Sequence, residues 1–255
     1  MLLNRFENQV AIVTGGGQGI GFEICRLLAL NGASVMLNDI DDALAASAAD
    51  KITRANGSCI ALAGDAADLN FIHQMVDTAV ERFGKLTMAV ANAGITLFGD
   101  FLSYPESSFS KVMQVNLGGS FFLAQAAARA MKQQGTGGRI LFTSSVTGHQ
   151  AHKNLAAYGM TKAALEMLAK NLVIELSEYQ ITVNTIAPGA TTTERTTDDP
   201  GYEKVWSAIT PMGRPASVTD IANAALFLLS PEAGHITGQS LIIDGGWTSV
   251  SPSPY

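Results

Sequence analysis

Cysteine is scarce in this sequence, with 2 residues among 255, so a disulfide framework is excluded as the basis of the fold. Charged residues are also few, at 15% against 47% for hydrophobic residues, and a chain with this balance can bury a substantial core. The net charge of −6 and the lack of a basic stripe argue against nucleic acid as a partner.

Long hydrophobic runs are absent as well. No apolar stretch approaches the roughly 18 residues that a membrane helix needs, and the first nine residues lack the charged-then-apolar order of a signal peptide. Cys25 and Cys59 both stand among apolar neighbours, so we expect them to be reduced core residues. These features predict a cytoplasmic protein without a membrane partner.

Short apolar strands alternate with helical patterns along the chain, and strands alternating with helices predict an α/β fold with a parallel sheet covered on both faces. No internal repeat or linker interrupts the pattern, so we expect one domain over residues 1–255. The expected strands are 10–14, 33–38, 58–63, 86–91, 139–143, 181–187 and 240–243, and the longer expected helices are 42–56, 105–134, 158–179 and 218–229.

The alternation breaks between residues 190 and 217, which are polar, Thr-rich and irregular. Long irregular segments in compact domains are usually functional lids or disordered. Because this one contains Tyr202, Trp206 and Ile209, we expect a partly ordered substrate lid and name residues 190–217 the lid segment. The last residues, 249–255, are rich in Ser and Pro and are expected to be extended.

The run Thr14-Gly-Gly-Gly-Gln-Gly-Ile-Gly21 lies between the first expected strand and a helical pattern. This arrangement places backbone N–H groups and a helix N-terminus against a pyrophosphate, and glycine is required because a Cβ would block close approach. The alternative is a glycine-rich turn without a ligand, but the flanking strand and helix favour nucleotide binding.

Asp39 ends the second expected strand, about twenty positions beyond the glycines, where a carboxylate suits the ribose diol and repels a 2′-phosphate. No Arg or Lys stands beside it, and Gln18 in the glycine run is uncharged. The sequence therefore favours NAD over NADP. The alternative role of Asp39, a cap on the next helix, can be filled by Asp41 instead.

Polar or small residues follow two more strands. Asp65, with Ala66, either contacts the adenine or caps a turn, and Asn92-Ala-Gly94 permits close approach of a cofactor. Asn116 falls inside the helical region 105–134, where asparagine is unfavourable because its side chain competes with the backbone. Either the helix is distorted around Asn116, or this residue is exposed and has no role.

The stretch from Ser145 ends in Tyr158-x-x-x-Lys162, and on a helix residues four apart share a face. A nearby ammonium favours the phenolate, which makes the phenol a usable general acid or base. Ser145 follows the strand 139–143, at the strand end where open α/β sheets bind ligands. The pattern alone is weak, because a surface helix gives the same spacing.

Together these motifs resemble the short-chain dehydrogenase/reductase superfamily over nearly the whole chain. The resemblance implies a Rossmann-like, doubly wound sandwich with a mostly parallel seven-stranded sheet, in homotetramers or homodimers. It also implies reversible hydride transfer between NAD(P) and an alcohol or carbonyl. The matching motifs are Thr14–Gly21, Asn92–Gly94, Asn116, Ser145, Tyr158-x-x-x-Lys162, Pro188-Gly189 and Asp244-Gly-Gly246.

The resemblance also implies roles for individual residues. Tyr158 is the acid/base, Lys162 supports it and bonds the nicotinamide ribose, Ser145 polarises the substrate carbonyl, and Asn116 holds a relay water. The cofactor-binding set expected from the motifs and the resemblance is Gly15, Gln18, Gly19, Ile20, Gly21, Asp39, Asp65, Ala66, Asn92, Ala93, Gly94, Tyr158, Lys162, Pro188, Gly189, Thr191 and Thr193. Two positions depart from the family: Thr87 stands where Asp is usual and Ala91 where Asn is usual, which questions the local sheet bonding.

The substrate pocket is expected to include Thr96, Val146, His152 and Trp206, although Trp206 packing as core is an equal alternative. A metal site at His149-x-x-His152 is disfavoured because no third ligand is near, so no metal is expected. The leading hypothesis is an NAD-dependent alcohol dehydrogenase or ketone reductase acting on a small molecule. The alternatives are a 3-oxoacyl-carrier-protein reductase that uses NADPH, and a non-catalytic NAD-binding sensor or scaffold.

Overall fold

The structure, a computed structural model, describes residues 5–251, so the expectations for residues 1–4 and 252–255 lie outside it. Its centre is a seven-stranded sheet in the order β3-β2-β1-β4-β5-β6-β9, in which every neighbouring pair is parallel. The predicted parallel α/β sheet is confirmed. The strands are β1 Val10–Val13, β2 Ser34–Asp39, β3 Ser58–Ala63, β4 Met88–Ala91, β5 Gly138–Thr143, β6 Ile181–Pro188 and β9 Ser240–Ile243.

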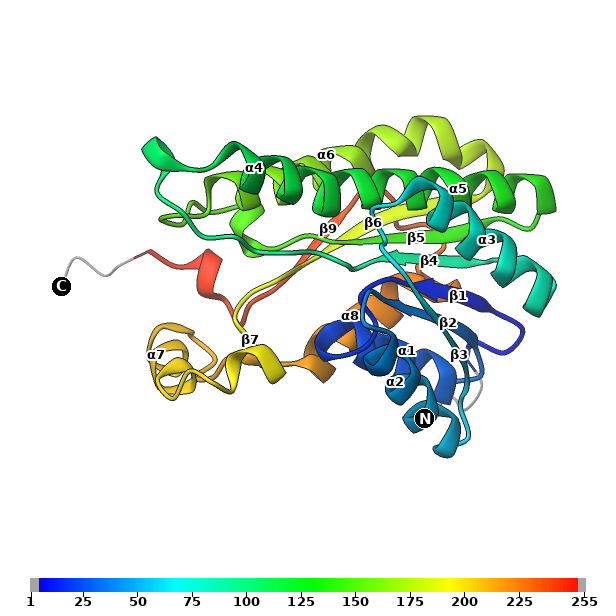
Figure 1. Cartoon of the computed structure of the whole chain (residues 1–255), viewed down its shortest axis with the longest axis horizontal. Helices are drawn as coiled ribbons and strands as arrows, with labels where there is room; N and C mark the ends of the chain where they lie inside the picture. The colour runs from blue at the N-terminus through cyan, green and yellow to red at the C-terminus, as the bar shows by residue number, and fades with distance from the viewer. Residues whose placement is uncertain (1–4, 252–255) are drawn as a thin grey trace.

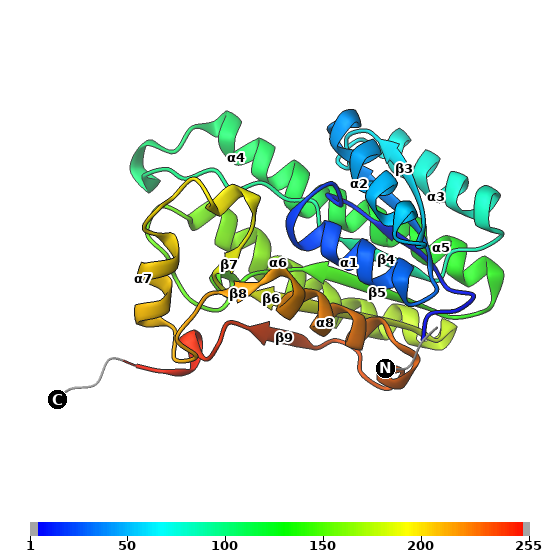
Figure 2. The same ribbon diagram turned by 90° about the horizontal axis from the view of Figure 1, so that it is seen from below.

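Helices cover both faces of this sheet (Figures 1 and 2). One apolar cluster joins the sheet to α1 (Gly19–Leu30), α2 (Asp42–Arg54) and α8 (Val218–Leu229). A second cluster joins the opposite face to α3 (Leu69–Phe83), α5 (Ser120–Gln134) and α6 (Ala156–Leu176). Burial on both faces explains why the central strands are continuous apolar runs rather than alternating ones.

The strand order reverses at β1, whose two neighbours are β2 and β4. In open parallel sheets, the crevice beyond the carboxyl ends of the strands at such a reversal is where ligands bind. The glycine run follows β1 and Asn92 follows β4, so this topology brings both motifs to the crevice.

The helical region expected over 105–134 is not one regular helix. It consists of α4 (Glu106–Val112), a π-helical stretch at Met113–Gly119 and α5. The π-helical stretch contains Asn116, which is fully buried. The expectation of a distortion around this residue is therefore confirmed, and the alternative of an exposed Asn is wrong.

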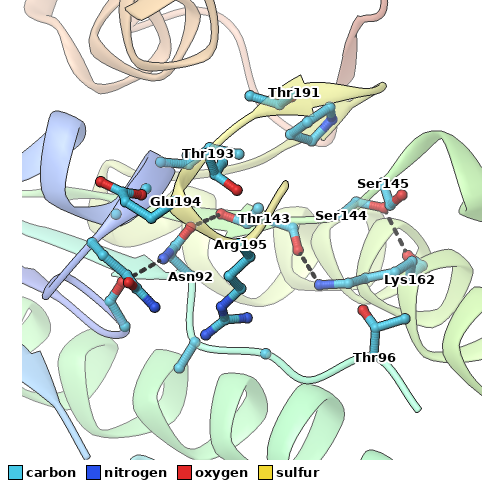
Figure 3. A pocket seen from close by; sticks show the side chains of 18 of the residues that line it. Asn92, Thr96, Thr143, Ser144, Ser145, Lys162, Thr191, Thr193, Glu194 and Arg195 are labelled. Atoms are coloured by element: carbon cyan, nitrogen blue, oxygen red, sulfur yellow. Dashed lines mark hydrogen bonds between the residues drawn. The ribbon is translucent and has the colours of Figure 1, made fainter. Parts of the chain in front are cut away.

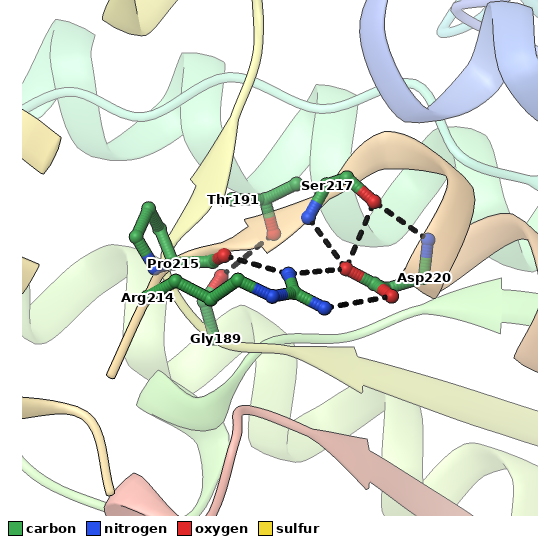
Figure 4. Close-up of polar contacts among 6 residues, drawn as sticks. All are labelled: Gly189, Thr191, Arg214, Pro215, Ser217 and Asp220. Carbon is green, nitrogen blue, oxygen red and sulfur yellow. Dashed lines mark hydrogen bonds and ion pairs between the residues drawn. The ribbon is translucent and has the colours of Figure 1, made fainter. Parts of the chain in front are cut away.

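The lid segment is partly ordered, as expected. It contains a two-residue parallel pair, β7 (Thr191–Thr192) with β8 (Ala216–Ser217), a 3-10 helix at Glu194–Thr196, and α7 (Tyr202–Ile209). Its end is secured where Arg214 pairs with Asp220 at 2.7 Å and Ser217 caps α8 (Figure 4).

Thr87 and Ala91, the two positions that differ from the family pattern, leave no side-chain hydrogen-bonding group without a partner. The Thr87 hydroxyl donates to the Val10 carbonyl at 3.1 Å and accepts from the Val10 amide at 2.9 Å, and Ala91 is buried in the core.

The two cysteines are not paired with each other. Cys25 is buried, and burial raises the pKa of the half-buried Cys59 thiol to about 12. Across residues 5–251, no helix is both long and apolar enough to cross a membrane.

Candidate active site

A cavity of about 260 Å³ opens at the carboxyl ends of the central strands (Figure 3). It brings together most of the residues that the sequence predicted, although their chemical roles remain predictions. The predicted residues that line it are Gly15, Gln18, Gly19, Ile20, Gly21, Asp39, Asn92, Ala93, Gly94, Thr96, Ser145, Tyr158, Lys162, Pro188, Gly189, Thr191 and Thr193.

Lys162 is a buried cation, and its surroundings explain how the fold accommodates it. Its ammonium Nζ donates to the carbonyl oxygen of Thr143, the last residue of β5, at 2.7 Å. The same Nζ lies 5.3 Å from the centroid of the Tyr158 ring, one helical turn earlier on α6. A charge-assisted hydrogen bond partly offsets the cost of burial, and it fixes the ammonium beside the phenol.

Asn116 fastens the chain after β4 to α6. Its Oδ1 accepts from the Ile95 amide at 2.8 Å, while Nδ2 donates to the Ile95 carbonyl at 2.9 Å and to Thr161 Oγ1 at 3.3 Å. A Cβ added to Gly94 would lie 3.3 Å from Asn116 Oδ1 and 3.5 Å from Lys162 Nζ, so these groups converge on one point. The π-helical distortion is what presents Asn116 to them.

Ser145 and its neighbour Ser144 follow β5 but face different partners. Ser145 lines the cavity, and its Oγ accepts from the Thr147 amide at 3.2 Å. Ser144 Oγ donates to Glu166 Oε1 at 2.7 Å, and His149 Nε2 lies 2.8 Å from the same carboxylate oxygen. This network supports the β5–α6 corner, and only its spacing of one turn beyond Lys162 could have indicated Glu166.

The glycine run forms a tight cradle. Gly15 has φ +63°, and a Cβ on Gly21 would collide with the Gly15 carbonyl. Asn92 Nδ2 donates to the carbonyls of Thr14 and Gly15 at 3.0 and 3.1 Å, which ties the run to β4. The first turn of α1 has neither a side-chain cap nor an acidic residue, so its free N–H groups suit an anion. These features fit a dinucleotide with its diphosphate at the start of α1.

Asp39 is held in place by backbone groups. Its Oδ2 accepts from the Gly17 amide at 3.0 Å and its Oδ1 from the Asp41 amide at 3.2 Å. Asp41 accepts from the Leu44 amide at 2.9 Å and caps α2. The cap role that was open for Asp39 therefore belongs to Asp41, and the Asp39 carboxylate lines the cavity.

The Pro188-Gly189 turn packs against the Asp244-Gly-Gly246 motif. The Gly189 amide donates to Ile243 O at 2.9 Å, and a Cβ on Gly189 would lie 2.7 Å from the Asp244 Cβ. Burial by itself would raise the pKa of Asp244, but hydrogen bonds from Thr248 and Gly246 outweigh it, and the pKa is lowered. The motif therefore fixes the turn that forms one wall of the cavity.

Asp65 and Ala66 are not brought to the cavity. Asp65 Oδ1 accepts from the Ala67 amide at 2.8 Å, which is the turn-capping alternative. The Ala66 carbonyl packs on the π-helical stretch, where a Cβ on Gly119 would lie 2.6 Å from it. Neither residue lines the space that the other cofactor candidates share.

Three of the four expected substrate residues also lie outside this cavity. Val146 is buried. The His152 ring packs on Trp247 at 5.1 Å between centroids, and Trp247 packs on Trp206 at 5.5 Å. Trp206 thus packs the lid segment down rather than lining the cavity, because aromatic contacts with a distant part of the chain hold it there.

His149 and His152 do not form a pair. His149 faces Glu166, whereas His152 packs on Trp247, although both residues line a second cavity of about 400 Å³. Within the part of the chain that the structure describes, no group of three His, Cys, Asp or Glu residues is placed to hold a metal ion.

Four lining residues were not predicted: Thr143, Ser144, Glu194 and Arg195. The last two belong to the lid segment and directly follow Thr193. The only sequence signal for them was their place in that segment, because nothing local shows which lid side chains turn inward.

Comparison with known proteins finds one matching family and several similar dehydrogenases. Residues 15–248 match a family described as Enoyl-(Acyl carrier protein) reductase. An L-rhamnose 1-dehydrogenase (NAD(P)(+)) of Azotobacter vinelandii is 38% identical over 94% of this chain and 96% of its own length. A 7alpha-hydroxysteroid dehydrogenase of Escherichia coli (strain K12) is 36% identical over 95% of each chain.

Solved structures agree with these relatives. A 7 alpha-hydroxysteroid dehydrogenase complexed with NADH and 7-oxo glycochenodeoxycholic acid superposes with a TM-score of 0.91 at 35% identity. The match covers 95% of this chain and 96% of that one.

Proposed function

The chain belongs to the short-chain dehydrogenase/reductase superfamily, and from this premise we propose that it is an NAD-dependent alcohol dehydrogenase or carbonyl reductase. The similar dehydrogenases support the coarser part, an oxidoreductase of CH–OH groups with a nicotinamide cofactor. The observation that carries the proposal is the convergence of Tyr158, Lys162 and Ser145 on one cavity beside an uncapped glycine-rich helix start.

Each side chain has a chemical task in this proposal. The Tyr158 phenol takes the proton from the alcohol, or returns it to the carbonyl oxygen, with the fixed Lys162 ammonium 5.3 Å from its ring centroid. Ser145 Oγ donates to the substrate oxygen, and Asn116 keeps the Gly94 segment open beside Lys162. The nicotinamide supplies or accepts the hydride when the cofactor is bound.

The preference for NAD rests on Asp39. Its carboxylate lines the cavity at the end of β2, where it suits the 2′-hydroxyl of a ribose and repels a 2′-phosphate. The expected result is a clearly higher kcat/KM with NAD(H) than with NADP(H). A preference for NADPH would instead favour the 3-oxoacyl-carrier-protein reductase.

The decisive test is NADH absorbance across a panel of secondary alcohols and ketones with wild type and Tyr158→Phe. Loss of the phenol should lower turnover by about 10²- to 10⁴-fold, the usual contribution of general acid–base catalysis. NADH binding, measured by fluorescence, should change little because the ring remains. A variant that keeps wild-type turnover sinks the mechanism.

A matched control is Tyr179→Phe. Tyr179 follows α6, and its hydroxyl accepts a hydrogen bond from Lys132 at 2.7 Å, away from the cavity. This variant should retain activity. If the wild type binds NADH but turns over no member of the panel, the non-catalytic sensor or scaffold is the better reading.

Assembly and location belong to the same proposal. Phe121 and Phe122 on α5, with Met167 and Ile174 on α6, are exposed, and Ile174 shows 87% of its surface. Exposed apolar side chains on neighbouring elements are typical of subunit contacts. We therefore expect a homotetramer or homodimer in the cytoplasm, with residues 190–217 acting as a lid on one domain, and light scattering checks the assembly.

A further inference from the structure

The lid segment places a carboxylate beside the start of α1 and an arginine in the same cavity. The atoms nearest to a Cβ built on Gly19, the first residue of α1, belong to the lid segment: Thr193 Cγ2 at 3.6 Å and Glu194 Oε2 at 3.7 Å. The 3-10 helix at Glu194–Thr196 is stabilised by a capping box, in which the Thr193 amide donates to Thr196 Oγ1 at 2.9 Å. The backbone turn that carries Glu194 and Arg195 is therefore stabilised by its own hydrogen bonds.

Arg195 extends from this turn into the cavity, as Figure 3 shows. Within residues 5–251 it takes part in no ion pair, whereas Arg214 at the far end of the lid segment is paired with Asp220. An arginine that faces a cavity without a carboxylate partner has its planar set of donors available for a ligand.

The charges of the cavity indicate which ligand group this is. The charged side chains among its lining residues are Asp39, Lys162, Glu194 and Arg195. Lys162 is already bonded to Thr143 O and lies beside Tyr158. Of these two cations, Arg195 is thus the one that has no hydrogen-bond or ion-pair partner within residues 5–251, and the proposed cofactor would bring two phosphate charges to the cavity that it lines.

We propose that Arg195 binds the diphosphate of the dinucleotide from the lid side, and that Glu194 opposes the same group until the lid segment adjusts. This inference rests on the proposed NAD-dependent function. Arg195 donates to phosphate oxygens on the side opposite the α1 N–H groups, so that cofactor binding and lid position are coupled. Glu194 places a carboxylate beside the anion site, and its repulsion limits affinity.

The test measures binding rather than turnover. Titration calorimetry with ADP-ribose, which keeps the diphosphate and lacks nicotinamide, should show Arg195→Gln binding roughly 10-fold or more weakly than wild type, the effect of losing a charge-assisted hydrogen bond. Arg195→Lys should recover part of the loss, since it keeps the charge but not the fork. Glu194→Gln should bind a few-fold more tightly.

Two controls isolate the diphosphate. Arg82→Gln removes an exposed arginine on α3 that lies outside the lid segment and does not line the cavity, and it should leave the Kd of ADP-ribose unchanged. Adenosine, which has no phosphate, should bind with the same Ki in wild type and Arg195→Gln when its competition with NADH is corrected for the affinity of NADH. The Kd of ADP-ribose should also rise less steeply with salt in Arg195→Gln, because one ion pair is missing.

The outcomes separate the possible failures. An unchanged Kd for ADP-ribose in Arg195→Gln overturns the assignment, as does an equal weakening of adenosine, which would indicate a distorted lid. If Arg195→Gln raised the KM for the carbonyl substrate but left ADP-ribose binding unchanged, Arg195 would bind the substrate instead, and the assignment to the diphosphate would also be overturned. A wild type that binds neither NADH nor ADP-ribose overturns the proposed function itself.

Discussion

The cofactor side of the cavity and its outer mouth are held together in different ways. On the cofactor side, Asn92 and Asn116 bond directly to the backbone of other segments, and glycines allow contacts that no side chain could permit. At the mouth, the loop between β4 and α4 exposes Phe98, Phe101 and Leu102, the last by 92%. Both this loop and α7 lie beyond the carboxyl ends of the strands (Figures 1 and 2).

The difference shows which part of the molecule can change without unfolding. Satisfied buried hydrogen bonds allow few substitutions, because removing one partner leaves the other group unpaired. Exposed apolar side chains at the mouth contribute little to stability and remain available to meet a substrate. The mouth is thus the part of this chain that tolerates substitution, and under the proposed function we expect substrate specificity to vary there; the cofactor side is the part that the fold depends on.

The largest expected effect separates the two regions by stability. Phe142→Ala in β5 empties a fully buried site beneath the cavity and should lower the free energy of unfolding by about 3–5 kcal/mol. Phe101→Ala at the mouth, where the side chain is 77% exposed, should change it by less than about 0.5 kcal/mol. Urea denaturation measures both, and equal losses would break the comparison.

Asn116→Ala probes the polar part of the cofactor side. It leaves the Ile95 amide and carbonyl without their partners, and each such loss costs about 1–3 kcal/mol in buried surroundings. The expected result is a loss of about 2–3 kcal/mol by urea denaturation, together with lower kcat because the Gly94 segment shifts beside Lys162. Asn171→Ala on the exposed face of α6 is the matched control, and a similar small effect in both variants contradicts the role given to Asn116.

The smallest expected effect concerns pH and the join between α1 and α8. Glu23 is buried and accepts from Arg26 at 2.7 Å and from Thr219 of α8 at 2.8 Å. The Arg26 hydrogen bonds, with that of Thr219, lower the pKa of Glu23 below its ordinary 4.5 despite burial. A lowered folded-state pKa stabilises the fold above pH 4.5, and this contribution is lost as pH falls through the lowered value.

The corresponding experiment compares wild type with Glu23→Gln. The variant should be less stable by about 1–2 kcal/mol at pH 7, toward the low end of the roughly 1.5–3 kcal/mol of hydrogen bonds to charged groups because the amide oxygen still accepts hydrogen bonds. This difference in stability should narrow as the pH falls below 4.5. Glu81→Gln on the exposed side of α3 should show little difference at any pH. If the difference in free energy of unfolding between wild type and Glu23→Gln instead widened in acid, a lowered pKa of Glu23 in the folded state would be contradicted.

Local patterns in the sequence determined the sheet, the glycine cradle and the Tyr158–Lys162 pair. Apolar runs and a spacing of four residues are properties of a few neighbouring residues, and the helix or strand they form fixes their geometry. Even the unfavourable Asn116 was informative, because a polar residue inside a helix has to find a partner, and the π-helical stretch is how it finds one.

The lid and the mouth were decided only by tertiary structure. The sequence left open whether Trp206 lines the substrate pocket or packs the lid down. It packs on Trp247, a residue far along the chain, and no local sequence pattern indicates such a contact. Glu194 reaches the start of α1, and Arg195 reaches the cavity, because the chain turns back after β6, which periodicity does not predict. Irregular segments are positioned by contacts between residues far apart in sequence, whereas helices and strands are specified largely by their own periodicity.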